Sequence, residues 1–140
     1  MSARGPLETG SGTGVITGID IRPVRDVGGN RFEDRTLQGT VDGALDGTFV
    51  QETSGKVDKH DRVVFRGRIT FSGELENCGE GTIQLGMSGK GHIPEAGFPI
   101  TEARVRVINQ AENTIAVTGT GTIRQEGPNL EYDIRYQCID

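Results

Sequence analysis

The stretch VVFRGRITFSGEL, residues 63–75, decides the fold class because its side chains alternate between two kinds of surface. Its odd positions carry Val, Phe, Gly, Ile and Leu, and its even positions are mostly Arg, Thr, Ser and Glu. A period of two residues is that of a β-strand with one apolar and one solvated face. No window of ten or more residues shows a convincing helical period. The sequence therefore predicts an all-β protein with no substantial helix.

The same alternation recurs along the chain and predicts eight strands, separated by segments rich in turn-forming residues. The expected strands cover residues 13–26, 32–41, 45–57, 63–75, 81–91, 101–109, 113–125 and 130–138. Residues 1–12 are expected to form a flexible leader, and residues 13–140 a single domain.

Pairing across the turns tests this assignment, because directly opposed residues share a face. A turn centred on His60 places Phe49 opposite Phe71 inside and Glu52 opposite Arg68 outside. These pairings match apolar with apolar and acid with base, so they favour an antiparallel hairpin.

The other hairpins follow in the same way. Turns centred on Cys78 and Ala111 are expected to oppose Gly73 to Ile83 and Val105 to Val117. An even-length loop at 126–129 opposes Ile123 to Tyr132. The first hairpin needs an odd-length loop around Gly29 if Ile19 and Ile21 are to join the inner face.

Eight sequential antiparallel strands with one apolar face must cover that face. Closing the sheet into an up-and-down barrel does so and removes both edges. The interior of such a barrel is wide enough to be filled by side chains or to hold one small ligand. A two-sheet sandwich is the alternative. The absence of a long crossover connection favours the barrel.

Gly-Thr pairs recur at residues 12–13, 39–40, 47–48, 81–82, 119–120 and 121–122, and the last strand is rich in Tyr. In this pattern residues 12–138 resemble the allene-oxide-cyclase-like group of β-barrels, most closely its small uncharacterised bacterial members. The resemblance implies an eight-stranded barrel that is often oligomeric, and some of the group are cyclases or isomerases of small molecules. No catalytic residue of those enzymes matches a position of this chain.

Composition narrows the classes of partner. The chain has 140 residues and a net charge of −5, and its 15 Lys and Arg residues are scattered without a basic run, which argues against nucleic-acid binding. No apolar run approaches the roughly 18 residues of a membrane helix. The N-terminus lacks a secretory signal, although an exported, processed chain would look the same. The sequence is compatible with a homo-oligomer.

The strand order sorts the loops into two ends. We call end A the end with loops 27–31, 58–62, 92–99 and 126–129, and end B the end with loops 42–44, 76–80, 110–112 and both termini. The long loop at 92–99 makes end A the expected place for a pocket. Polar residues on the expected inner face or near the mouth are the candidate ligand-binding residues: Thr17, Glu33, Arg35, Gln51, Thr53, Gln125, Tyr132 and Tyr136.

These polar groups need partners, because an unpaired buried polar group costs a few kcal/mol. They could bond one another, water or a ligand. Glu33 and Arg35 would form an ion pair near the mouth if both point inward, and they would otherwise lie on a solvated rim.

Metal and cofactor chemistry has little support. Asp58, His60 and Asp61 crowd one hairpin tip, where three adjacent groups rarely close a metal site. His92 opens the long loop and could act as a base, but no partner for it can be identified. We therefore predict no metal and no cofactor.

The two cysteines, Cys78 and Cys138, both fall at end B, so a disulfide is geometrically allowed. Two unrelated thiols are the alternative. A disulfide would point to an exported protein, and free thiols to a cytoplasmic one.

The sequence is compatible with three functions. The first is a barrel that binds a small molecule in its interior without catalysis. The second is an isomerase or cyclase, which would need convergent polar groups in a pocket. The third is a packed structural or interaction module with no ligand. The volume and lining of the interior discriminate between them.

Overall fold

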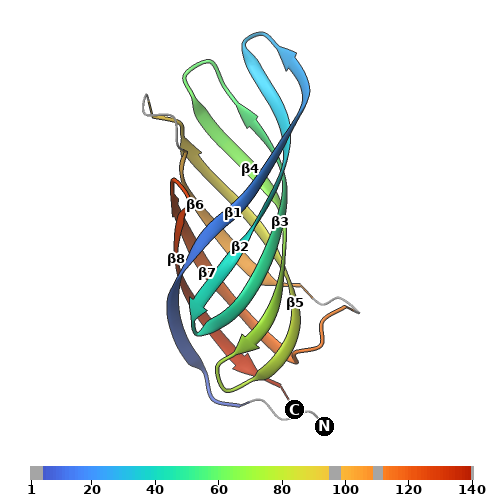
Figure 1. Ribbon diagram of the computed structural model, residues 1–140, viewed down its shortest axis with the longest axis vertical. Coiled ribbons are helices and arrows are strands. Elements are labelled where there is room, and N and C mark those ends of the chain that lie inside the picture. The colour runs from blue at the N-terminus through green and yellow to red at the C-terminus, as the bar shows by residue number, and fades with distance from the viewer. Residues whose placement is uncertain (1–4, 95–98, 109–111, 140) are drawn as a thin grey trace.

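The computed structural model describes residues 5–94, 99–108 and 112–139, and these form a closed eight-stranded antiparallel barrel with up-and-down order (Figure 1). The expectation of an all-β barrel is confirmed, and the two-sheet sandwich is excluded. The strands are β1 (Glu8–Val27), β2 (Asn30–Gly43), β3 (Leu45–Val57), β4 (Arg62–Leu75), β5 (Gly79–His92), β6 (Ile100–Val107), β7 (Val117–Glu126) and β8 (Asn129–Cys138).

The core lies inside the barrel, where one face of every strand points. Inward positions are odd in β2 to β7 and even in β8, so the period-two pattern sorts side chains as predicted. Phe49 and Phe71 oppose each other, and Phe71 is only 1% exposed. Tyr132 and Tyr136 complete the aromatic part of this core. Burying such rings supplies much of the hydrophobic stabilisation.

The β3–β4 hairpin has the predicted register, with Phe49 opposite Phe71 and Glu52 opposite Arg68. The β7–β8 hairpin also agrees, with Ile123 opposite Tyr132. The start of β1 and the end of β8 lie at end B, at the bottom of Figure 1, and the β1–β2 and β3–β4 hairpins extend at the opposite end.

The corner between β2 and β3 depends on Gly43, which has a φ of 103°. L-residues with a side chain rarely adopt this conformation. Further along β2, Gly39 allows a close approach: a Cβ there would lie 2.9 Å from the Phe49 ring. The glycines of this segment therefore shape the barrel wall and let an aromatic ring pack against it.

The N-terminal strand differs from the prediction. β1 begins at Glu8, and residues 8–15 pair with β8 to close the barrel. Residues 8–12, which were expected to belong to a flexible leader, are therefore part of β1. The β1–β2 turn is Gly28–Gly29, a two-residue loop and not an odd-length one, and both glycines have positive φ. This is the geometry of a tight hairpin turn.

Two irregularities in β1 change its inward parity instead. The register shifts between Ile16 and Gly18 and again between Pro23 and Arg25. Each extra residue is a β-bulge, which moves the following side chains to the other face. Ile19 consequently opposes Leu37 on the inner face, as expected, although it lies on the extended hairpin and is 57% exposed.

Two further registers differ from the prediction. The β4–β5 turn centres on Asn77, not Cys78, so Gly73 opposes Gly81 and not Ile83. Asn77 has a φ of 68°, a conformation that Asn tolerates better than most residues. The face of each residue is unchanged, because the shift is by two positions.

The β6–β7 register differs by four positions, since Val105 opposes Gly121 and not Val117. The cause is a longer connection that continues along β5. The amide of Ile108 donates to the Gln84 carbonyl, and the amide of Thr114 donates to the Thr82 carbonyl. The expected turn centre, Ala111, lies outside the described residues.

Among the described residues, no helix has the length and apolar character needed to span a bilayer.

Candidate functional site

The candidate site is a cavity of about 360 Å³ inside the barrel at end A. Its apolar walls come from inward residues of β1 to β4 and from the described ends of the 92–99 loop. The apolar lining consists of Ile19, Ile21, Leu37, Gly55, Val57, Val63, Phe65, Ile93 and Pro99. The polar lining consists of Arg31, Glu33, Arg35, Gln51, Thr101 and Gln125. This volume is within the range of small-molecule sites.

A charged cluster lies on the β2 wall of this cavity. Glu33 and Arg35 are two residues apart on one strand, so both side chains lie on the same face of β2. Arg35 donates from Nε (3.1 Å) and from a terminal nitrogen (2.9 Å) to one Glu33 carboxylate oxygen. Arg31 Nε lies 3.4 Å from the other oxygen. The side chain of Glu33 is 10% exposed and that of Arg35 is 18% exposed, so the pair points inward and is not a solvated rim.

The charge of this cluster is not balanced. Glu33 contributes one negative charge, whereas Arg31 and Arg35 contribute two positive charges. Because both arginines bind the same carboxylate, the cluster carries one net positive charge beside a cavity with apolar walls. A charge in such surroundings interacts more strongly with an anion than it would in bulk water.

Uncharged polar side chains line the rest of the mouth. Thr101 Oγ1 donates to Gln125 Oε1 (3.4 Å), and the side-chain nitrogen of Gln125 donates to the Gly127 carbonyl (3.1 Å). Gln51 and Thr53 are buried, and neither side chain makes a hydrogen bond with the described residues. No fully buried side-chain nitrogen or oxygen of the described residues lacks a partner. The polar atoms of Gln51 and Thr53 therefore keep access to open space, and Gln51 meets it in the cavity.

The two candidate tyrosines lie in the interior but serve end B. The Tyr132 hydroxyl accepts from the Leu45 amide (2.8 Å) and donates to the Asp42 carbonyl (2.6 Å). The Tyr136 hydroxyl donates to the Glu76 carbonyl (3.0 Å). Burial raises the pKa of both hydroxyls above the usual value of 10.0. These groups hold the end-B turns and do not line the cavity.

The prediction that Thr17 faces inward is wrong. Thr17 is the extra residue of the first bulge in β1, and its side chain is exposed. Its hydroxyl lies 3.4 Å from the Gln38 carbonyl on the outer surface. The period-two pattern cannot show a bulge, which inserts a residue without changing the composition of the strand.

The hairpin tip at residues 58–61 is a structural turn. The Asp58 carboxylate accepts from the amides of His60 (2.8 Å) and Arg62 (3.0 Å) and from Arg62 Nε (2.8 Å). The Arg62 amide is the main cause that lowers the pKa of Asp58 to about 2, with further contributions from the His60 amide and the Arg62 side chain. His92 is exposed at the end of β5 and is not part of the cavity lining.

Sequence reasoning missed two polar residues of the site, Arg31 and Thr101. Thr101 occupies an inward odd position at the start of a predicted strand, so the alternation carried the signal. Arg31 lies beside the first turn, and the expected second strand begins only at residue 32. The two-residue loop extends β2 back to Asn30 and so includes Arg31 in the strand.

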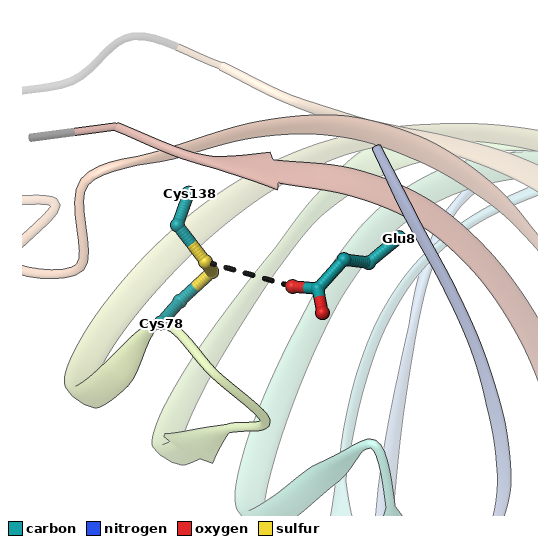
Figure 2. A group of neighbouring side chains, drawn as sticks. All are labelled: Glu8, Cys78 and Cys138. Carbon is teal, nitrogen blue, oxygen red and sulfur yellow. Dashed lines mark hydrogen bonds between the residues drawn. A yellow bond between two sulfur atoms is a disulfide. The ribbon is translucent and has the colours of Figure 1, made fainter. Parts of the chain in front are cut away.

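End B is closed by the disulfide between Cys78 and Cys138, whose Cα atoms are 5.2 Å apart. Figure 2 shows the carboxylate of Glu8 directed at the bridge, with an oxygen 3.9 Å from Cys138 Sγ. The other carboxylate oxygen accepts from the side-chain amide of Asn77 (2.6 Å). Glu8 therefore joins β1 to the β4–β5 turn.

Among the described residues, Glu8, Cys78 and Cys138 form the one convergent group of metal-ligating types. A cysteine binds zinc through its thiolate sulfur. Both sulfurs are committed to the disulfide, so this group does not fit a zinc ion while the bridge is intact.

Comparison of the chain with protein-family models and with curated protein sequences finds no match.

Proposed function

We propose that this protein binds a small amphipathic molecule with a carboxylate group in the end-A cavity, without catalysing a reaction. The observation that carries the proposal is the net positive Arg31–Glu33–Arg35 cluster on the wall of an otherwise apolar cavity. A carboxylate would neutralise this charge and accept hydrogen bonds from the guanidinium groups. The rest of the ligand would contact Leu37, Val63 and Phe65.

The distribution of interior side chains supports binding over the packed-module alternative. The end-B half of the interior is filled by the core, whereas the end-A half leaves space. Gln51 offers the cavity an amide that the described residues do not engage. Pockets of this kind bind ligands through a few polar groups and broad apolar contact.

The lining supports binding more than catalysis. Its described part holds no His, Cys or Asp, and its one carboxylate, Glu33, is held by two arginines. A general base must be free to accept a proton from the substrate. The isomerase or cyclase activity that the resemblance leaves open has no specific observation in its favour.

The experiment compares two probes of matched shape, octanoate and octanol, by isothermal titration calorimetry. Octanoate should bind at least tenfold more tightly, because only it carries the charge. Arg35→Met should abolish this preference, whereas Arg22→Met, on the exposed outer surface, should leave it intact. Native mass spectrometry of the purified protein would show any ligand that co-purifies. Equal affinity for both probes, or no binding of either together with an empty native spectrum, would refute the proposal.

A further inference from the structure

Four arginines gather on the outer face of the barrel, on the wall formed by β4, β5 and β6. Arg66 and Arg68 are outward residues of β4, and Arg104 and Arg106 are outward residues of β6. All four are exposed. The cluster cannot be seen in the sequence, because β4 and β6 lie on either side of β5 in the sheet but are far apart along the chain.

The strand registers align these arginines in two rows across β5. In the first row Arg66 opposes Ser88, which opposes Arg104. In the second row Arg68 opposes Gly86, which opposes Arg106. Each row is therefore an arginine, a small residue and a second arginine. We call these six residues the arginine rows.

Strand geometry sets the spacing of the arginine rows. Neighbouring strands lie about 4.8 Å apart, so the two arginine Cα atoms of one row are about 10 Å apart. The rows are two residues apart along β5, which is about 7 Å. Only a hydrogen atom or a hydroxymethyl group rises between the arginines of a row. An open groove on the outer surface is lined by all six residues.

The charges of the arginine rows lack carboxylate partners. Within the described part of the chain, none of the four guanidinium groups lies within 4.0 Å of a carboxylate, whereas Arg22, Arg31, Arg35 and Arg62 do have such partners. Glu52 opposes Arg68 in register but forms no ion pair with it. Four like charges repel one another, and a bound anion would relieve that repulsion.

We propose that the arginine rows bind a compact ligand with at least two phosphate or sulfate groups, one for each row. An arginine can bind such an oxyanion through two parallel N–H groups. The Ser88 hydroxyl adds a donor to one row, and Gly86 leaves space above the backbone in the other. This site is independent of the end-A cavity, because its side chains point away from the interior.

The neighbouring side chains argue for a compact ligand over single-stranded nucleic acid. Proteins that bind single strands stack bases on aromatic side chains. The described outward positions of β4, β5 and β6 carry no Phe, Tyr or Trp. The arginine rows therefore offer charge recognition without a stacking surface.

The experiment measures binding of tripolyphosphate, sucrose octasulfate and inorganic phosphate by isothermal titration calorimetry at low ionic strength. A multivalent probe should bind at least tenfold more tightly than inorganic phosphate, and the tighter of the two multivalent probes identifies the preferred oxyanion. Amide shifts of Gly86 and Ser88 in NMR spectra of the unmodified protein should move on titration. This readout does not depend on any variant folding.

Two double variants test the rows separately: Arg66→Gln with Arg104→Gln, and Arg68→Gln with Arg106→Gln. Each should weaken binding of the multivalent probe at least tenfold. The control, Arg22→Gln with Lys59→Gln, removes the same charge from end A and should change the affinity less than twofold. An equal loss in the control, unmoved Gly86 and Ser88 signals, or tighter binding of a single-stranded oligonucleotide than of either multivalent probe would overturn the proposal.

Discussion

Removing the Cys78–Cys138 disulfide should destabilise the protein by a predictable amount. The bridge joins residues that are 60 apart in the sequence. In the chain-entropy model, a closed loop of this length restricts the unfolded chain by about 4 kcal/mol. The double variant Cys78→Ser/Cys138→Ser should therefore lose up to about 4 kcal/mol of unfolding free energy.

The folded barrel should persist in this variant, because other contacts hold the same turn. The Glu76 amide donates to the Ala44 carbonyl (2.9 Å), and the Tyr136 hydroxyl donates to the Glu76 carbonyl. Asn77 remains bonded to Glu8. The effect should therefore arise mainly in the unfolded state, which expands when the cross-link is removed. The slope of unfolding free energy against urea should increase accordingly.

Urea unfolding followed by circular dichroism measures both quantities. The variant should unfold at a lower urea concentration with a steeper slope, and the unmodified protein treated with a reductant should behave in the same way. A loss below about 1 kcal/mol would refute the chain-entropy argument. A variant without the β-sheet spectrum in the absence of urea would refute the claim that the remaining contacts suffice.

Three other predictions follow from the described contacts. Tyr132→Phe should cost about 1–3 kcal/mol of unfolding free energy, because it leaves the part-buried Leu45 backbone amide without its acceptor. An unchanged urea midpoint would contradict this. The low pKa of Asp58, about 2, means that its stabilising contribution is present above the unfolded value of 3.8 and is lost as the pH falls through about 2. The pKa values of Tyr132 and Tyr136 are raised, so the contribution of these hydroxyls to folding stability is complete below pH 10.0 and is progressively lost at higher pH. NMR titration of the Asp58 carboxylate tests the acid prediction, and the absorbance of the tyrosine phenolates tests the alkaline one. Gly39→Ala should cost about 1–3 kcal/mol, because its Cβ would meet the Val15 carbonyl and the Phe49 ring, whereas Gly86→Ala, whose Cβ has 3.4 Å to its nearest neighbour, should be nearly neutral in the same urea assay.

The register could be predicted in the β3–β4 and β7–β8 hairpins, where the turn has the expected length and centre. In the β3–β4 hairpin the alternation sets the face of each residue and the tight turn sets its partner, so Phe49 meets Phe71 as expected. The prediction failed where the backbone inserts residues, and it missed the β4–β5 register because Asn77, not Cys78, centres that turn. The bulge at Thr17 lies beside a hydrogen bond from the Ile16 amide to the Pro128 carbonyl, and the connection after Ile108 is hydrogen-bonded to β5. These tertiary hydrogen bonds leave no local pattern in the sequence.

The candidate site was predictable only in part, for a related reason. Glu33 and Arg35 are two residues apart on one strand, so their shared face and contact follow from local geometry. Tyr132 was correctly placed in the interior, but its use at end B depends on Asp42 and Leu45, which are distant in the sequence. The alternation of the sequence predicts whether a side chain faces inward or outward. The strand register determines how far along the barrel axis the residue lies.

Strand β4 separates the two proposed sites and fixes both of them. Phe65 lines the cavity, and the next residue, Arg66, lines the outer groove. A slip of β4 by one residue would turn Arg66 and Arg68 toward the core and expose Ile69 and Phe71, because it moves every side chain to the opposite face. Burying two unpaired charges would cost far more than any gain from an alternative pairing. The arginines that form the proposed anion site therefore also hold β4 in the register that builds the cavity wall.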